Sequence, residues 1–160
     1  MEELEGKLVG VGVEALLKRL KELGVGIEVL SQSDKIFQLG EGILRVRKEG
    51  DKFILTHKGK LRKKGPLKSR EETEFLVSDP GRVMELLSAL GVDISHPRTN
   101  EKRLFRFYVA GAKGELVFIK GLPPTLELEG SEDNIRKACE LLGLRFEDLK
   151  PISWFDIQPM

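Results

Sequence analysis

The stretch MEELEGKLV, residues 1–9, carries charged side chains at alternate positions. Side chains alternate between two faces along a β-strand, so a strand here would place Glu3, Glu5 and Lys7 on one face. Leu4, Gly6 and Leu8 would lie on the opposite face. Two carboxylates beside an ammonium group indicate either an exposed, solvated edge or a site that holds a cation together with an anion.

The same alternation recurs in the other segments that resemble strands. Each has an apolar face and a face with charged residues two positions apart: Arg45 and Arg47; Thr56 and Lys58; Arg70, Glu72 and Glu74; Glu127 and Glu129. For any single strand, a solvated face with cross-strand ion pairs is the simplest interpretation. For all of them together, the pattern favours a barrel whose charged face points inward. Such an interior must hold water and a charged ligand, because burying unpaired ions costs several kcal/mol each.

Three Glu-x-Glu segments are each followed by a helix-like stretch and a Leu-Gly pair. The helix-like stretches, with apolar residues three and four apart, are EALLKRLKELGV, RVMELLSALGV and NIRKACELLGL. Two hairpins lie between them, one turning at Gly50-Asp51 and one turning through residues 112–114. The pattern predicts an α+β fold of two β-α-β-β-β halves and a last helix, forming one closed antiparallel β-barrel flanked by helices, as a single domain over residues 1–160. The basic stretch 58–70 between the halves is expected to be a solvated loop.

Composition excludes several classes of function. The 160 residues include 27 Lys plus Arg and 26 Asp plus Glu, for a net charge of +1. This balance gives no support for nucleic acid or a membrane as a partner. The only cysteine, Cys139, rules out an intrachain disulfide and makes a cysteine-based zinc site improbable. Because no apolar run reaches about 18 residues and the acidic start is unlike a signal peptide, we expect a cytoplasmic protein.

The inward charges indicate the chemistry of the ligand. Arginine and lysine bind phosphate oxygens, and arginine can bind two at once. Clustered carboxylates hold divalent cations such as Mg²⁺, which bridge to phosphates. Arg, Lys and Glu in one tunnel therefore predict a polyphosphate with its metal ion.

These segments, in this order, resemble the CYTH superfamily, which includes class IV adenylyl cyclases, thiamine triphosphatases and inorganic triphosphatases. The N-terminal Glu3-x-Glu5-x-Lys7 is similar to the hallmark of that superfamily. The segments LRVR, LTHKG, SREETEF and LELEG resemble its later strands, and KPISWFD resembles its C-terminal segment, with Trp154 in place of a tyrosine. The resemblance covers essentially the whole chain and implies a triphosphate tunnel, which is an antiparallel barrel flanked by helices.

The resemblance also implies roles for individual residues. The metal-binding set would be Glu3, Glu5, Glu127 and Glu129, with Mg²⁺ or Mn²⁺ as the cofactor. The phosphate-binding set would be Lys7, Arg45, Arg47, Lys58, Arg70 and, from the strand before the last hairpin, Lys102 or Arg103. Lys7 and Lys58 would also be catalytic. Glu72 and Glu74 would orient the basic residues or hold a second metal ion.

The sequence departs from the superfamily at two places. Where the superfamily has Lys-x-Arg, alternation favours an inward Lys102 with Arg106, whereas motif order favours Arg103. Where it often has an aspartate, this chain has Val117, and Glu115 has the same facing and is a possible substitute. Either Glu115 takes the place of the aspartate and the site is retained, or the site is altered and its reaction is slow.

Three functions follow, and the residues do not separate the first two. Attack by water would make the protein a triphosphatase, and attack by the ribose 3′-hydroxyl of ATP would make it an adenylyl cyclase. A non-catalytic module that binds polyphosphate or nucleotides is the alternative. The expected partner is a small triphosphate, namely ATP, thiamine triphosphate or tripolyphosphate, and a homodimer is possible. We expect His57 to be packed or partly exposed and not a base, His96 to lie in a loop, and Cys139 to lie in the core. Trp154 is expected to seal the outer packing of the barrel, and stacking on a base near a tunnel mouth is the alternative.

Overall fold

The structure is a computed structural model that describes residues 2–159, with side chains from residue 4 onward. The strands are β1 (Glu2–Val9), β2 (Glu28–Leu39), β3 (Gly42–Glu49), β4 (Lys52–Lys58), β5 (Arg62–Lys64), β6 (Leu67–Val77), β7 (Arg98–Val109), β8 (Ala112–Phe118) and β9 (Thr125–Gly130). The helices are α1 (Val13–Glu22), α2 (Pro80–Ala89) and α3 (Glu132–Leu142). Two 3₁₀ turns, η1 (Phe146–Asp148) and η2 (Trp154–Asp156), follow α3.

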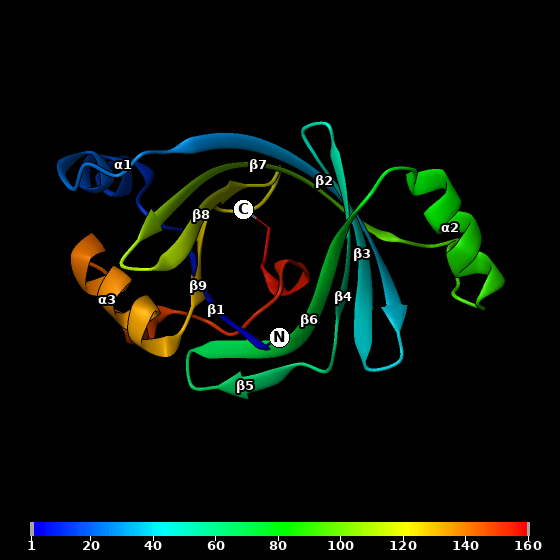
Figure 1. Cartoon of the computed structure of the whole chain (residues 1–160). Helices are drawn as coiled ribbons and strands as arrows, with labels where there is room; N and C mark the ends of the chain where they lie inside the picture. Colours follow the sequence, from blue (N-terminus) through cyan, green and yellow to red (C-terminus); the bar gives the residue numbers. More distant parts are fainter. Residues whose placement is uncertain (1, 160) are drawn as a thin grey trace.

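Eight of these strands form a closed antiparallel barrel. The sheet runs in the order β1-β9-β8-β7-β2-β3-β4-β6, and β6 pairs back to β1 to complete the ring (Figure 1). The short β5 pairs with β6 outside this ring. The predicted α+β barrel and its two β-α-β-β-β halves are therefore confirmed, with β5 as an addition between the halves.

The helices begin and end where local chemistry satisfies their free backbone groups. The side chain of Asp79 accepts a hydrogen bond from the backbone N–H of Arg82 at the start of α2, and Ser131 does the same for Asn134 at the start of α3. Gly143 ends α3 with a φ of 71°, a left-handed conformation that favours glycine. Among residues 2–159, no helix combines the length and the apolar character needed to span a bilayer.

The apolar cores lie outside the barrel, between its outer wall and the helices. Helices α1 and α3 cover one side, where Leu20, Leu116, Leu128 and Ile135 are fully buried. Helix α2 covers the other side, where Leu87 packs with residues of β2 and β3 in a smaller core. Burial of the outward apolar face leaves the charged face of every barrel strand pointing inward.

Two sequence-based expectations about loops are wrong. The second hairpin turns at Ala110 and Gly111, with φ values of 52° and 78°, rather than through residues 112–114. The basic stretch 58–70 is not a loop throughout, because β5 and the first residues of β6 form a hairpin within it. That hairpin turns Lys68 toward the barrel interior.

Candidate active site: a charged tunnel through the barrel

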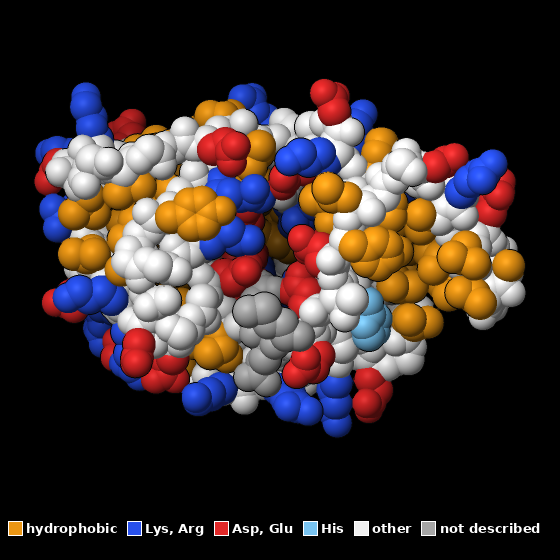
Figure 2. All heavy atoms as spheres, viewed as in Figure 1, with side chains coloured by type: hydrophobic (Ala, Val, Ile, Leu, Met, Phe, Trp, Pro, Cys, Tyr) orange, Lys and Arg blue, Asp and Glu red, His pale blue; other side chains and the backbone are white. Residues whose placement is uncertain are grey.

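The inward faces of the strands surround a tunnel with a cavity volume of about 1150 Å³. In Figure 2, acidic and basic side chains gather around a central hollow on this face of the molecule. The cations that line the tunnel are Lys7, Arg45, Arg47, Lys58, Lys68, Arg70, Arg98, Lys102, Arg106 and Lys113. The acids that line it are Glu5, Asp34, Glu41, Glu49, Glu72, Glu74, Glu115, Glu127 and Glu129.

Carboxylates from β1 and β9 form an acidic cluster on one wall. One oxygen from each of Glu5, Glu127 and Glu129 lies within 4.8 Å of the others. The strand register explains this closeness, because Glu5 lies opposite Glu129 and Lys7 lies opposite Glu127. The side chain of Glu3, predicted to join this set, lies outside the described residues. Lys7 Nζ lies 3.2 Å from Glu127 and 3.8 Å from Glu5.

The electrostatics of the acidic cluster suit a cation. Burial alone would raise the pKa of Glu5, but Lys7, Lys58 and Lys68 outweigh it and hold that pKa well below its usual value. The pKa of Glu129 rises to about 7, first because it is buried and then because Glu127 and Glu5 repel its charge, although Lys113 partly offsets this. Three crowded carboxylates, one of which resists ionisation, form a donor set that a divalent cation would stabilise.

A buried ion-pair group on the wall made by β2, β3 and β7 includes a residue that sequence reasoning missed. Asp34 is 1% exposed and accepts two hydrogen bonds from Arg47, at 2.7 and 2.9 Å. Lys102 Nζ lies 3.5 Å from the same carboxylate. Asp34 therefore fixes the direction of two predicted phosphate-binding cations. The pKa of Lys102 falls to about 7, because burial and repulsion by Arg47 outweigh the attraction of the Asp34 carboxylate.

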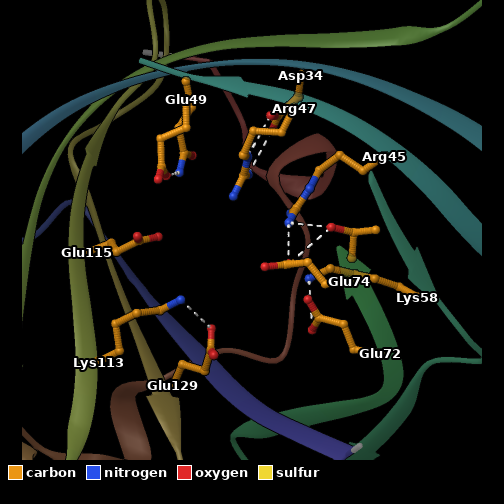
Figure 3. Close-up of polar contacts among 12 residues, drawn as sticks. Asp34, Arg45, Arg47, Glu49, Lys58, Glu72, Glu74, Lys113, Glu115 and Glu129 are labelled. Atoms are coloured by element: carbon orange, nitrogen blue, oxygen red, sulfur yellow. Dashed lines mark hydrogen bonds and ion pairs between the residues drawn. The ribbon is translucent and has the colours of Figure 1, made fainter. Parts of the chain in front are cut away.

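Arg45 projects into the tunnel from β3, opposite the acidic cluster in the barrel order (Figure 3). Its Nη2 atom lies 3.5 Å from Thr56 Oγ1 and 3.8 Å from the Glu74 carboxylate. The Nε atoms of Arg45 and Arg70 and the amide nitrogen of Asn100 are buried without a hydrogen-bond partner among the described residues. Buried donors without partners cost free energy, so these atoms indicate a place for an anion.

Two lysines connect the arginine wall with the acidic cluster. Lys58 Nζ lies 3.9 Å from Glu72, and burial lowers the pKa of Lys58. Burial and the neighbouring Glu74 raise the pKa of Glu72 to about 7. Lys68, which was expected to be solvated, is 6% exposed and its Nζ lies 2.9 Å from Glu5. It extends the predicted set of cations.

The two departures from the motif pattern have structural outcomes. Arg106 donates hydrogen bonds to Glu115 and Glu49, at 2.7 and 2.9 Å, and lines the tunnel together with Lys102. Arg103 points to the outer face of β7, so its predicted place in the phosphate site is wrong, because odd-numbered residues of β7 face away from the tunnel. Glu115 lines the tunnel as expected. Val117 is buried opposite Leu104 and Thr125 in the neighbouring strands.

The aromatic residue of the C-terminal segment also lies elsewhere than expected. Trp154 lines the tunnel, with its ring centroid 4.8 Å from Lys7 Nζ and 4.9 Å from Lys102 Nζ, so the expectation of outer packing is wrong. Cys139 is buried in the main core, as expected. His57 is exposed, and His96 lies in the loop before β7 at the edge of the tunnel.

Comparison with known proteins identifies the fold. No protein-family model and no curated protein matches the sequence. A solved protein from Pyrococcus horikoshii is 25% identical, covers 98% of this chain and 99% of its own, and has a TM-score of 0.78. A proposed adenylyl cyclase from Hippeastrum, described as having a dominant triphosphatase activity, is 17% identical over 96% of this chain and 93% of its own, with a TM-score of 0.63.

The same fold also occurs in a chain of the Mediator head module. A chain of the Schizosaccharomyces pombe Mediator head module is 14% identical over 95% of this chain and 99% of its own, with a TM-score of 0.73. The fold therefore does not by itself identify an activity. The closed eight-stranded barrel with its charged lumen is the fold that this chain shares with these solved proteins, one of them a proposed adenylyl cyclase, and it agrees with the fold expected from the resemblance of the motifs.

Proposed function

We propose that this protein is a metal-dependent enzyme that binds a triphosphate in the tunnel and transfers its terminal phosphoryl group to water. One observation carries the proposal: donor atoms of Arg45, Arg70 and Asn100 are buried in the tunnel wall without partners among the described residues, and carboxylates of β1 and β9 crowd together opposite Arg45 in the barrel order. An anion that binds together with a divalent cation would accept hydrogen bonds from these donors, and its cation would neutralise the carboxylates. A triphosphate is such a ligand, and the activity described for the Hippeastrum protein agrees with it.

In this proposal each wall has its own task. Glu5, Glu127 and Glu129 would hold Mg²⁺ or Mn²⁺, which would supply a Lewis acid for the phosphate oxygens. Arg45 and Arg47 bind the phosphate chain and neutralise the negative charge that develops as the terminal P–O bond breaks. Lys7, within the acidic wall, and Lys58, on β4, balance the charge of the carboxylates beside them.

The alternatives differ in what accepts the phosphoryl group. An adenylyl cyclase would use the ribose 3′-hydroxyl of ATP and release cyclic AMP with pyrophosphate. A binding module would release nothing, and the occurrence of this fold in the Mediator head module together with Val117 supports that alternative.

Product analysis separates these functions. Purified protein is incubated with tripolyphosphate, ATP or thiamine triphosphate, each with Mg²⁺, with Mn²⁺ or with a chelator. We expect release of orthophosphate that depends on the added metal ion. Cyclic AMP would identify a cyclase. Binding without any product would identify a binding module, and Trp154, the only tryptophan, lies beside two tunnel lysines and provides a fluorescence signal for that binding.

A matched pair of variants tests the acidic wall. Glu5→Gln removes a carboxylate from the cluster, whereas Glu101→Gln removes one that is exposed and accepts a hydrogen bond from Ser33. We expect Glu5→Gln to abolish the stimulation by Mg²⁺ and Glu101→Gln to retain it. Equal stimulation in both variants would show that the cluster does not hold the metal ion.

Triphosphate affinity is expected to fall as the pH rises above 7. The pKa of Lys102 is about 7, so the free protein loses this charge between pH 7 and 8, while a bound triphosphate favours the protonated form. Affinity should then fall by up to tenfold per pH unit in this range, because binding takes up one proton. Calorimetry in buffers with different ionisation enthalpies measures that uptake. Lys102→Arg keeps its charge and should remove the part of this proton uptake that comes from Lys102, while Glu72 and Glu129, whose pKa values are also about 7, still contribute. An unchanged slope would contradict the assignment.

A further inference from the structure

The C-terminal segment that follows α3 returns to the barrel and is fixed to β1. Backbone hydrogen bonds join Lys7 and Lys150 in both directions, at 3.0 and 2.7 Å. Gly6 permits this approach, because a Cβ at that position would lie 3.1 Å from Leu149 Cβ and 2.9 Å from a methyl group of Leu67. The next residues enter the ring of strands, where Figure 1 shows them as the red segment.

Trp154 lies across the lumen. The two ammonium groups that contact its ring come from β1 and β7, which are separated in the barrel by β8 and β9. A ring that contacts both, and that lines the cavity, must therefore lie in the space between the strands. Its backbone is held in a 3₁₀ turn, since the Asp156 carboxylate accepts hydrogen bonds from the Ser153 backbone and hydroxyl at 3.0 Å.

The two ends of the tunnel consequently differ. At the end where the C-terminal segment lines the tunnel, Phe155 lies 5.0 Å from the Arg98 guanidinium, at the first residue of β7. Tyr108 is ten residues further along that strand, or about 33 Å at the usual rise per residue, and it is 63% exposed. Side chains of the charged site lie between these two positions. The tunnel is thus a pocket with an open mouth near Tyr108 and an aromatic floor at Trp154.

We propose that Trp154 is a stop that limits the chain length of the phosphate ligand. This inference rests on the proposed function, because it assumes that a linear phosphate chain enters the tunnel. Each further phosphate adds negative charge and needs cationic partners, whereas the indole ring provides an apolar face already occupied by Lys7 and Lys102. A chain therefore enters from the open mouth, its end comes to rest against Trp154, and it does not pass through the barrel.

Binding stoichiometry tests this proposal on the unaltered protein. Calorimetry with Mg²⁺ compares tripolyphosphate with long linear polyphosphate. A stop predicts one protein molecule per accessible chain end, whatever the length of the chain. Passage through the barrel predicts a number of bound protein molecules that rises with chain length. The second result, with normal binding of tripolyphosphate, would overturn the stop and leave the proposed function intact. Absence of tripolyphosphate binding would instead overturn the proposed function.

Variants test the residue itself. Trp154→Ala is expected to improve the affinity for long chains relative to tripolyphosphate by about tenfold, equivalent to 1.4 kcal/mol, and to let protein molecules accumulate along one chain. Trp154→Phe keeps a ring on the floor and should retain the wild-type ratio. Tyr108→Ala removes an aromatic group at the open mouth and should also retain it. If the ratio does not change in a folded Trp154→Ala protein, Trp154 is not the stop.

Discussion

Replacement of Arg45 by methionine is expected to reduce triphosphate turnover by about 10²–10³-fold, the usual cost of losing one donor that stabilises transition-state charge. Arg45 points into the tunnel with a buried Nε that has no partner among the described residues. Burial and repulsion by Arg47 lower its pKa, so the folded protein holds this charge at a cost. The free energy of unfolding should therefore fall by no more than about 1 kcal/mol. Steady-state kinetics and urea unfolding measure the two effects.

Arg45→Lys is the matched control for charge without the planar guanidinium. It should recover only part of the activity, because an ammonium group does not reproduce a two-point contact with phosphate. If Arg45→Met instead lost several kcal/mol of stability and kept its turnover, Arg45 would be a structural residue of the barrel and the anion site would have to lie elsewhere.

Replacement of Asp34 by alanine is expected to lower the free energy of unfolding by about 3–5 kcal/mol, the range for breaking a buried ion pair from one side. Its carboxylate accepts two hydrogen bonds from Arg47 and lies 3.5 Å from Lys102 Nζ. Alanine would leave both cations buried beside each other without that anion. Urea unfolding at pH 7 measures the loss.

A second substitution identifies the cause of that loss. The double variant Asp34→Ala, Arg47→Met removes one of the two cations and should recover part of the lost stability. Tripolyphosphate should also stabilise Asp34→Ala more than it stabilises the wild type, because the ligand returns negative charge to the same place. If the double variant were less stable than Asp34→Ala by the full effect of Arg47→Met alone, the two residues would not be coupled.

The charged lumen could be predicted because the strands alternate strictly. In residues 4–8 of β1, 44–47 of β3 and 126–130 of β9, charged residues alternate with apolar residues or glycine, so the face on which each side chain lies follows directly from strand geometry. The same rule placed Lys102 and Arg106 inward, where the structure has them, whereas motif order favoured Arg103. At this strand the physical pattern was the better predictor.

Other parts of the site leave no such pattern. The sequence of β2, SQSDKIFQL after residue 30, mixes polar residues on both faces, so alternation does not distinguish the buried Asp34. Lys68 follows a Gly-Pro pair in a run of exposed basic residues, and only the pairing of β6 with β1 brings it to Glu5. Trp154 lies in a short 3₁₀ turn with no period, and its place depends on the bridge between Lys7 and Lys150.

Closure of the barrel has a consequence for how the chain folds. The strand β1 comes first in sequence, yet its two neighbours are β6 and β9, so its partners lie roughly 65 and 125 residues away. Hairpins such as β3–β4 and β7–β8 need only local contacts and can form early. The carboxylates and lysines of β1 therefore stay in water until the most distant contacts form. The free-energy cost of removing these charges from water falls on a late step of folding.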